Sequence, residues 1–205
     1  MTAITHFALQ DFPWLDSIAM VKASEQFDSY EAFHRYVNDN LRHNSAETRR
    51  RYAQLLQRRF FPDRSLDSLV PVVWRQYHDQ QLLEDCMRVT ALEGEPTVAA
   101  FIVENILPLA PGAPLLHEAA REFIERSLGE YKPKSHERLL RTCRLLGFLS
   151  RDREGHVAAL LRPSPDALLI LLHDRLAPAP RIVRLQELLA SPWWRYLGLR
   201  DPDEV

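Results

Sequence analysis

Basic side chains, which bind phosphate groups, concentrate in two segments of the sequence. Residues 41–64 contain seven arginines and two acidic residues, and residues 132–162 contain eight lysines and arginines against three acidic residues. The remainder of the chain is acidic, which brings the net charge to −2. A guanidinium group can donate two parallel hydrogen bonds to a phosphate or to the edge of a guanine base. The charge distribution therefore favours a polyanionic ligand, and solvated helix faces are the alternative.

The second basic segment contains a helix with the character of a DNA-reading helix. At helical spacing, the apolar residues between 139 and 146 fall on one side of a predicted helix over 135–146, and arginines fall on the other. Lysines precede this helix, and a charged turn at 150–155 follows it. Such a helix face, with its flanks, is suited to contact base edges and phosphates. The residues expected to contact DNA in this segment are Lys132, Lys134, Ser135, Arg138, Arg141, Arg144, Arg151 and Arg153.

The first basic segment contains a long helix predicted over 46–60, capped by Ser45 and ended before Pro62. Its apolar residues fall on one side, and its arginines and glutamines line the other. Arg49 falls nearer the apolar side, where an arginine extends its head group to solvent or pairs with an acid. The residues expected to contact phosphates in this segment are Arg49, Arg50, Arg51 and Arg58. The alternative is that these arginines pair with the acidic remainder of the chain.

Catalytic and metal-binding motifs are absent from the sequence. His117 and His136 are each followed by glutamate, as in the HExxH zinc motif, but Arg121 and Leu140 occupy the positions of the second histidine. No glycine-rich phosphate loop, GxSxG elbow or CxxC pair occurs. We therefore expect no catalytic residue, no metal ion, no small-molecule cofactor and no enzymatic activity.

The sequence carries no signal of export or membrane insertion. Its first ten residues lack the basic start and apolar run of a signal peptide. No apolar run approaches the roughly 20 residues that span a bilayer. The two isolated cysteines suit a reducing compartment. We therefore expect a cytoplasmic protein without a membrane segment.

Helical periodicity runs through almost the whole sequence and predicts a mainly α-helical fold. A segment rich in proline and glycine at 108–114 predicts a boundary between a helical N-terminal lobe, 1–110, and a C-terminal lobe, 111–205. Between 115 and 161, the order helix, turn, helix, strand, charged turn, strand is that of a winged helix. Gly147 is the expected left-handed stop of the second helix.

Two stretches of sequence carry more specific patterns. The run from Asn44 to Phe60 resembles the early Ser-Pro/Ala-x-Thr-x-(Arg/Lys) helix of the BrxA family, small proteins of BREX phage-defence systems. The terminal Trp-Arg-Tyr-Leu-Gly, Trp194–Gly198, the helix order and the chain length are also similar. The resemblance implies an N-terminal region similar to the NusB RNA-binding fold and a winged-helix-like C-terminal part. It further implies double-stranded DNA binding and action beside other BREX components.

These features predict a non-enzymatic protein of a BREX-type defence system that binds double-stranded DNA mainly through phosphates. Two alternatives stay open. A protein-interaction adaptor of the defence complex would use the same basic faces to dock an acidic partner. An RNA-binding protein would follow from the NusB-like resemblance.

Overall fold

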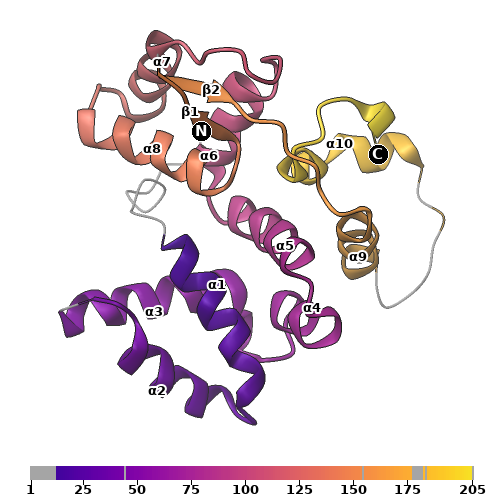
Figure 1. Cartoon of the computed structure of the whole chain (residues 1–205). Coiled ribbons are helices and arrows are strands. Elements are labelled where there is room, and N and C mark those ends of the chain that lie inside the picture. Colours follow the sequence, from indigo (N-terminus) through magenta and orange to yellow (C-terminus); the bar gives the residue numbers. More distant parts are fainter. Residues whose placement is uncertain (1–12, 44, 154, 177–181, 183, 205) are drawn as a thin grey trace. The chain divides into compact units, whose positions relative to one another are not determined.

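A computed structural model describes residues 13–43, 45–153, 155–176, 182 and 184–204 (Figure 1). The described chain is mainly α-helical and contains one two-stranded antiparallel hairpin, as the sequence predicts. Contacts group it into two compact units. The N-terminal unit comprises described residues 13–91 and 164–176, and the C-terminal unit comprises 92–163 with the described part of 182–204. No described helix is both long enough and apolar enough to span a bilayer.

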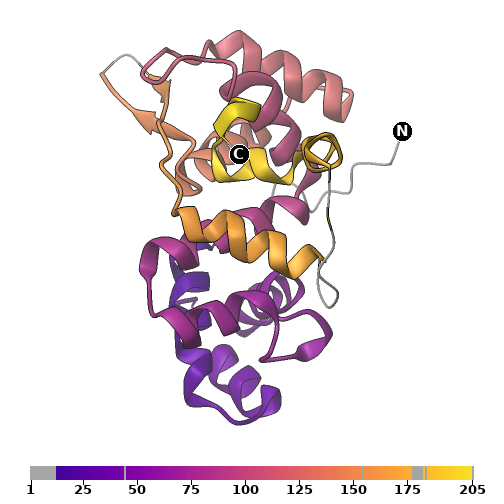
Figure 2. The same ribbon diagram turned by 90° about the vertical axis from the view of Figure 1, so that its right-hand side faces the viewer.

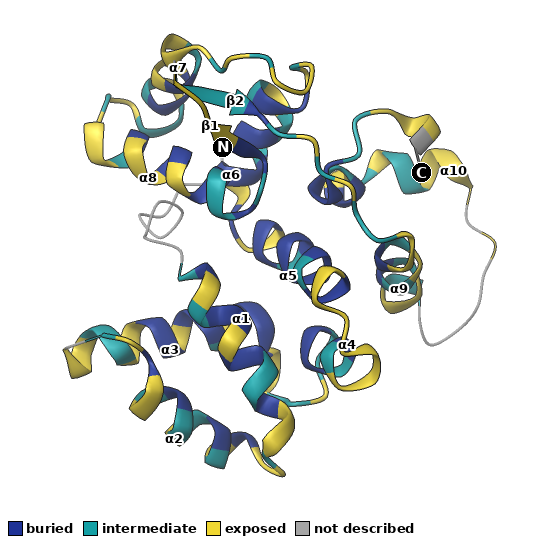
Figure 3. Cartoon of the chain, viewed as in Figure 1, coloured by how far each residue is buried: buried dark blue, intermediate teal, exposed yellow. Residues whose placement is uncertain are grey.

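Six helices that the structure describes build the N-terminal unit. They are α1 (Trp14–Ala23), α2 (Tyr30–Asn40), α3 (Ala46–Phe60), α4 (Leu69–Tyr77), α5 (Gln80–Glu93, whose last two residues belong to the C-terminal unit) and α9 (Pro165–Leu176). Helix α5 is buried along most of its length (Figure 3). In Figure 2, α9 is the orange helix that runs across this unit.

Local signals explain where the early helices begin and end. Helix α3 has the predicted bounds, and the Ser45 side chain caps it by accepting a hydrogen bond from the Thr48 amide at 3.5 Å. After α3, Asp63 and Arg64 both adopt left-handed backbone conformations, with φ of 55° and 56°. These two residues turn the chain toward α4.

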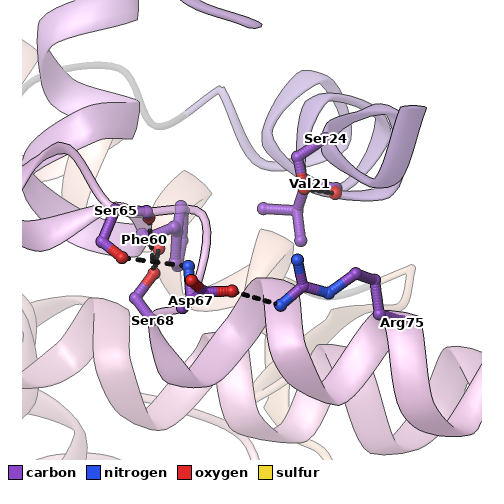
Figure 4. Close-up of polar contacts among 7 residues, drawn as sticks. All are labelled: Val21, Ser24, Phe60, Ser65, Asp67, Ser68 and Arg75. Carbon is purple, nitrogen blue, oxygen red and sulfur yellow. Dashed lines mark hydrogen bonds and ion pairs between the residues drawn. The ribbon is translucent and has the colours of Figure 1, made fainter. Parts of the chain in front are cut away.

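The turn that leads into α4 is closed by serine hydroxyls (Figure 4). The Ser68 hydroxyl donates to the Phe60 carbonyl at 2.7 Å, and the Asp67 amide donates to the Ser65 hydroxyl at 3.0 Å. Asp67 also pairs with Arg75 in the last turn of α4, at 2.7 Å. The start of α4 is therefore fixed to the end of α3.

A buried ion pair fastens α9 to the N-terminal unit. Asp85 and Arg88 lie on α5, are both buried, and approach to 2.5 Å. The second oxygen of Asp85 accepts a hydrogen bond from the Ser164 amide at 2.8 Å. Because Ser164 precedes α9, this carboxylate sets the position where that helix begins.

The C-terminal unit contains helices around a short hairpin. Its elements are α6 (Pro96–Phe101), the π-helical turn η4 (Ile102–Ile106), α7 (His117–Leu128), α8 (Pro133–Leu145), β1 (Leu149–Arg151), β2 (His156–Ala158), α10 (Leu185–Ala190) and the 3-10 segments η5 (Pro192–Leu197) and η6 (Pro202–Glu204). Helices α6, α7 and α8 pack together, with the rings of Phe101 and Phe123 centred 5.0 Å apart. Leu139, Cys143 and Phe148 are fully buried beside them.

Helix α8 begins two residues before the predicted start at Ser135. Lys132 is its N-cap residue and Pro133 its first helical residue, a position that suits proline because the amide there needs no partner. Gly147 follows with φ of 84°, which confirms the predicted left-handed stop. The two predicted strands form the hairpin, in which Leu149 pairs with Ala158 and Arg151 with His156.

The hairpin is held on a second side by the segment predicted as a linker. The Gly112 amide donates to the Ala158 carbonyl at 2.8 Å, and the Ala158 amide donates to the Ala113 carbonyl at 2.9 Å. The Leu115 amide donates to the His156 carbonyl at 2.8 Å. Both edges of β2 are therefore hydrogen-bonded, one to β1 and the other to residues 112–115.

The C-terminal segment fastens the strand that leaves the hairpin. Arg200 donates hydrogen bonds to the carbonyls of Leu107, Leu109 and Ala159. Gly198 has φ of 92°, and a Cβ atom there would lie 2.6 Å from the Cβ of Leu161. Glycine is therefore required at this position both for its backbone conformation and for the close approach.

Candidate nucleic-acid interface

Helix α8 places three basic side chains on one exposed face. Lys134, Arg138 and Arg141 are exposed and follow one another at i, i+4 and i+7, which aligns them along one side of a helix. We call these three residues the α8 basic stripe. Leu139 and Cys143 are fully buried on the opposite side, so the core sets the orientation of the stripe.

The residues at the start of α8 differ in their surroundings. Lys132 pairs with Glu130 at 2.8 Å, and this hydrogen bond lowers the pKa of the Glu130 carboxyl. Both side chains are exposed, and an exposed pair of this kind contributes little to stability. The ion pair with Glu130 therefore does little to fix the position of Lys132. Ser135 is half-buried beside it.

Arg144 lies in the last turn of α8 and is not on the exposed face of that helix. It is partly buried, and its Nε has no hydrogen-bond partner among the described residues. The pKa of His156 on β2 is lowered mainly by burial, and the positive charges of Arg144 and Arg151 lower it further. Arg144 is therefore less accessible to a ligand than Arg138 or Arg141.

The turn of the hairpin presents two more arginines. Arg151 and Arg153 are both exposed. The turn between the strands is closed by the Asp152 amide, which donates to the Gly155 carbonyl at 3.0 Å, and by the Gly155 amide, which donates to Asp152 Oδ1 at 2.8 Å. The described residues of the turn are therefore hydrogen-bonded to one another, and β2 is hydrogen-bonded along both of its edges.

A group of histidines connects α7, α8 and β2. The rings of His117 and His136 are centred 4.6 Å apart, and the Tyr131 hydroxyl lies 3.4 Å from Nδ1 of His136. Burial lowers the pKa of His136, and His117 and His156 lower it further. The Nε2 atoms of His136 and His156 are buried without hydrogen-bond partners among the described residues. Spacing in the sequence could not reveal this group because its members are 19 or more residues apart.

The described residues contain no group of His, Cys, Asp or Glu that could hold a metal ion. The two cysteines are free and buried. Burial raises the pKa of Cys86 to about 12 and raises the pKa of Cys143 as well. Both thiols therefore stay protonated near neutral pH and are poor nucleophiles.

In the N-terminal unit, the four predicted arginines of α3 divide into two kinds. Arg50, Arg51 and Arg58 have exposed side chains. Arg49 is half-buried and donates to the carbonyls of Asn38 at 3.0 Å and His43 at 2.7 Å. Arg49 therefore fastens the end of α2 and the loop after it, as its place near the apolar side of α3 suggests.

Two cavities of about 500 Å³ and 470 Å³ lie along α2 and α3. The first is lined by His34, Asn38, Asp39, Ala46, Arg49, Arg50 and Gln54, and the second by Tyr30, Glu31, His34, Arg35, Gln57 and Arg64. Arg35 and Arg64 are basic residues that the sequence did not single out. Arg35 lies outside the basic segments, and Arg64 is directed here by the left-handed turn after α3.

No protein-family model, curated protein or solved structure matches this chain.

Proposed function

We propose that this chain binds double-stranded DNA, with the α8 basic stripe in the major groove and Arg151 and Arg153 against the adjoining phosphates. The observation that carries the proposal is the exposed i, i+4, i+7 row of cations on α8, followed by a hydrogen-bonded hairpin that exposes Arg151 at the end of β1 and Arg153 in the turn. A major groove about 12 Å wide admits one α-helix. Guanidinium groups can contact phosphates and guanine edges there.

Duplex DNA suits this surface better than duplex RNA. The major groove of A-form RNA is deep and narrow, so a helix face cannot reach its bases. A protein that recognises single-stranded RNA uses exposed aromatic rings for stacking. Trp193, Trp194 and Tyr196 are buried in η5, which removes the strongest aromatic candidates of the C-terminal unit from that role.

The α3 arginines support a second phosphate contact by the N-terminal unit. Arg50, Arg51 and Arg58 are exposed, and Arg35 and Arg64 line the neighbouring cavity. Because contacts of this kind read no base, we propose that they add affinity without sequence preference.

The resemblance to the BrxA family supports a place for this DNA binding in a BREX-type phage-defence system, beside other BREX components and without enzymatic activity of its own. Buried thiols, as at Cys86 and Cys143, are compatible with a cytoplasmic location.

The test is fluorescence anisotropy of a labelled duplex of about 25 base pairs, titrated with the full chain at low salt. We expect Arg138→Glu/Arg141→Glu to weaken binding by at least tenfold, because two cations become two anions beside the phosphates. The matched variant Arg121→Glu/Arg126→Glu makes the same charge change on α7, where both arginines are already in ion pairs. It should weaken binding much less.

Undetectable duplex binding by the unmodified chain would overturn the proposal. Equal losses for the two variants would also overturn it, because only the net charge would then matter. Structured RNA that competes more strongly than duplex DNA would favour the RNA-binding alternative.

A further inference from the structure

Helices α4 and α9 border an open groove of about 620 Å³ in the N-terminal unit. The residues of α4 that line it fall at 69, 72, 73, 76 and 77, and those of α9 fall at 166, 169, 170, 173 and 174. Both sets follow the spacing i, i+3, i+4, i+7, i+8. This is the stripe with which a helix packs against another helix. Each wall of the groove therefore offers a helix-packing surface.

Each wall of the groove contributes apolar residues among polar ones, and two of the large apolar residues are exposed. Leu169 has 62% of its surface exposed and Tyr77 has 51%, and the two side chains line the same groove from its opposite walls. Helix α9 has the apolar run Ala167–Leu172, yet only Ala167 and Leu171 within it are buried. A helix that is apolar on most sides is normally enclosed by protein. Among the described residues, the side of α9 that carries Leu169 is therefore left uncovered.

The charges around the groove are acidic. Asp67, Asp166 and Asp174 are exposed and line it, and none of the described residues that line it is a lysine or an arginine. Asp67 is paired with Arg75 at 2.7 Å (Figure 4), so the charge offered to a ligand resides mainly on Asp166 and Asp174. These carboxylates repel nucleic acid and anionic lipid, and they attract a basic partner.

We propose that this groove binds an amphipathic helix of a partner protein, with leucine-like anchors between the two walls and lysine or arginine beside Asp166 and Asp174. Each wall stripe covers nine residues, or about 12 Å of helix, so the contact takes two to three turns of the partner. This is the helix-in-groove mode of peptide recognition. The site is acidic where the α8 basic stripe is basic, and it needs none of the residues proposed to contact DNA.

Three synthetic peptides of about 16 residues probe the groove. The basic peptide has leucines at i, i+3, i+4 and i+7 of a helix with lysines beside them. The acidic peptide replaces each lysine by glutamate, and the polar peptide replaces each leucine by glutamine. We expect the basic peptide to bind the full chain in fluorescence anisotropy, and the other two to bind at least about tenfold more weakly.

Variants of the chain locate the binding. Leu169→Ser should weaken binding of the basic peptide at least about fivefold, because it removes a central anchor contact. Leu185→Ser is the matched control, because Leu185 is 58% exposed on α10 and lies outside the groove. Asp166→Asn/Asp174→Asn should weaken binding of the basic peptide about threefold to tenfold and leave binding of the acidic peptide unchanged. Since Leu169 is largely exposed, its substitution should not unfold the chain, which circular dichroism verifies.

Several results would overturn the proposal. They are no binding of the basic peptide at about 1 mM, equal binding of the basic and acidic peptides, or equal effects of Leu169→Ser and Leu185→Ser. Sedimentation of the chain provides a further outcome. Self-association that Leu169→Ser abolishes would assign the groove to a second copy of this chain instead. Duplex DNA binding, measured on the same variants, should not change, so this test and the DNA-binding test can fail separately.

Discussion

The substitution Gly198→Ala tests how the C-terminal segment is fastened to the strand that leaves the hairpin. Gly198 has φ of 92°, and an added Cβ atom would lie 2.6 Å from the Cβ of Leu161. The left-handed backbone costs an alanine about 1 kcal/mol. Forcing a methyl group into a filled site costs about 1–3 kcal/mol. We therefore expect the free energy of unfolding to fall by about 2–4 kcal/mol.

The matched control is Gly129→Ala, at the end of α7. Gly129 has φ of 79°, and no described atom lies within 4 Å of an added Cβ. The free energy of unfolding of this variant should fall by only about 1 kcal/mol, the cost of the left-handed backbone. Urea unfolding, followed by tryptophan fluorescence, measures both losses, and the buried Trp193 and Trp194 lie close to Gly198 in sequence. Equal losses would refute the reasoning, because they would show that Leu161 moves aside at no cost.

Three further predictions concern charge. Replacing all three residues of the α8 basic stripe by glutamine should make the plot of log Kobs against log salt less steep by about 2–3 for duplex DNA, and an unchanged slope would show that the stripe touches no phosphate. Asp85→Ala removes a carboxylate that lies 2.5 Å from buried Arg88, so we expect a loss of about 3–5 kcal/mol in urea unfolding. Asp67→Ala, which removes an exposed pair, should cost less than about 1 kcal/mol, and similar losses for these two variants would contradict this assignment. Because burial lowers the pKa of His136, the unfolded chain takes up protons below the ordinary histidine pKa of about 6.5 while the folded chain resists. The stabilisation is therefore present above pH 6.5 or so and is lost as the pH falls below it. The unfolding temperature should decrease as the pH is lowered from about 7.5 to about 5.5, and His136→Gln should reduce this decrease. An identical decrease in both proteins would show that His136 is not its cause.

Features that depend on neighbouring residues could be predicted from the sequence. The bounds of α3 follow from the cap at Ser45 and the proline after Phe61, and both act within one helical turn. The order of α7, α8 and the hairpin follows from helical periodicity, the glycine at 147 and the charged turn. The predicted start of α8 at Ser135 was wrong by two residues, because proline at 133 occupies the first helical position.

Features that depend on distant residues could not be predicted in this way. The return of α9 to the N-terminal unit depends on the bond between Ser164 and Asp85, which are 79 residues apart. The same holds for the histidine group and for the α4–α9 groove. The exposure of Arg138 and Arg141 was predictable, because periodicity separates one side of a helix from the other. Lys134 was predicted to precede the helix and joins the stripe because α8 begins at Pro133. The partial burial of Arg144 was not, since it depends on β2.

The bonds on both edges of β2 have a consequence for any duplex that this protein binds. Because β2 is hydrogen-bonded both to β1 and to residues 112–115, moving the hairpin to follow the contour of the DNA would break bonds within the C-terminal unit. The double helix must then supply the adjustment by bending or by changing the width of its grooves, and the energy of that deformation depends on base sequence. A DNA-binding protein built in this way would prefer DNA sequences that deform easily, including at base pairs that no side chain contacts.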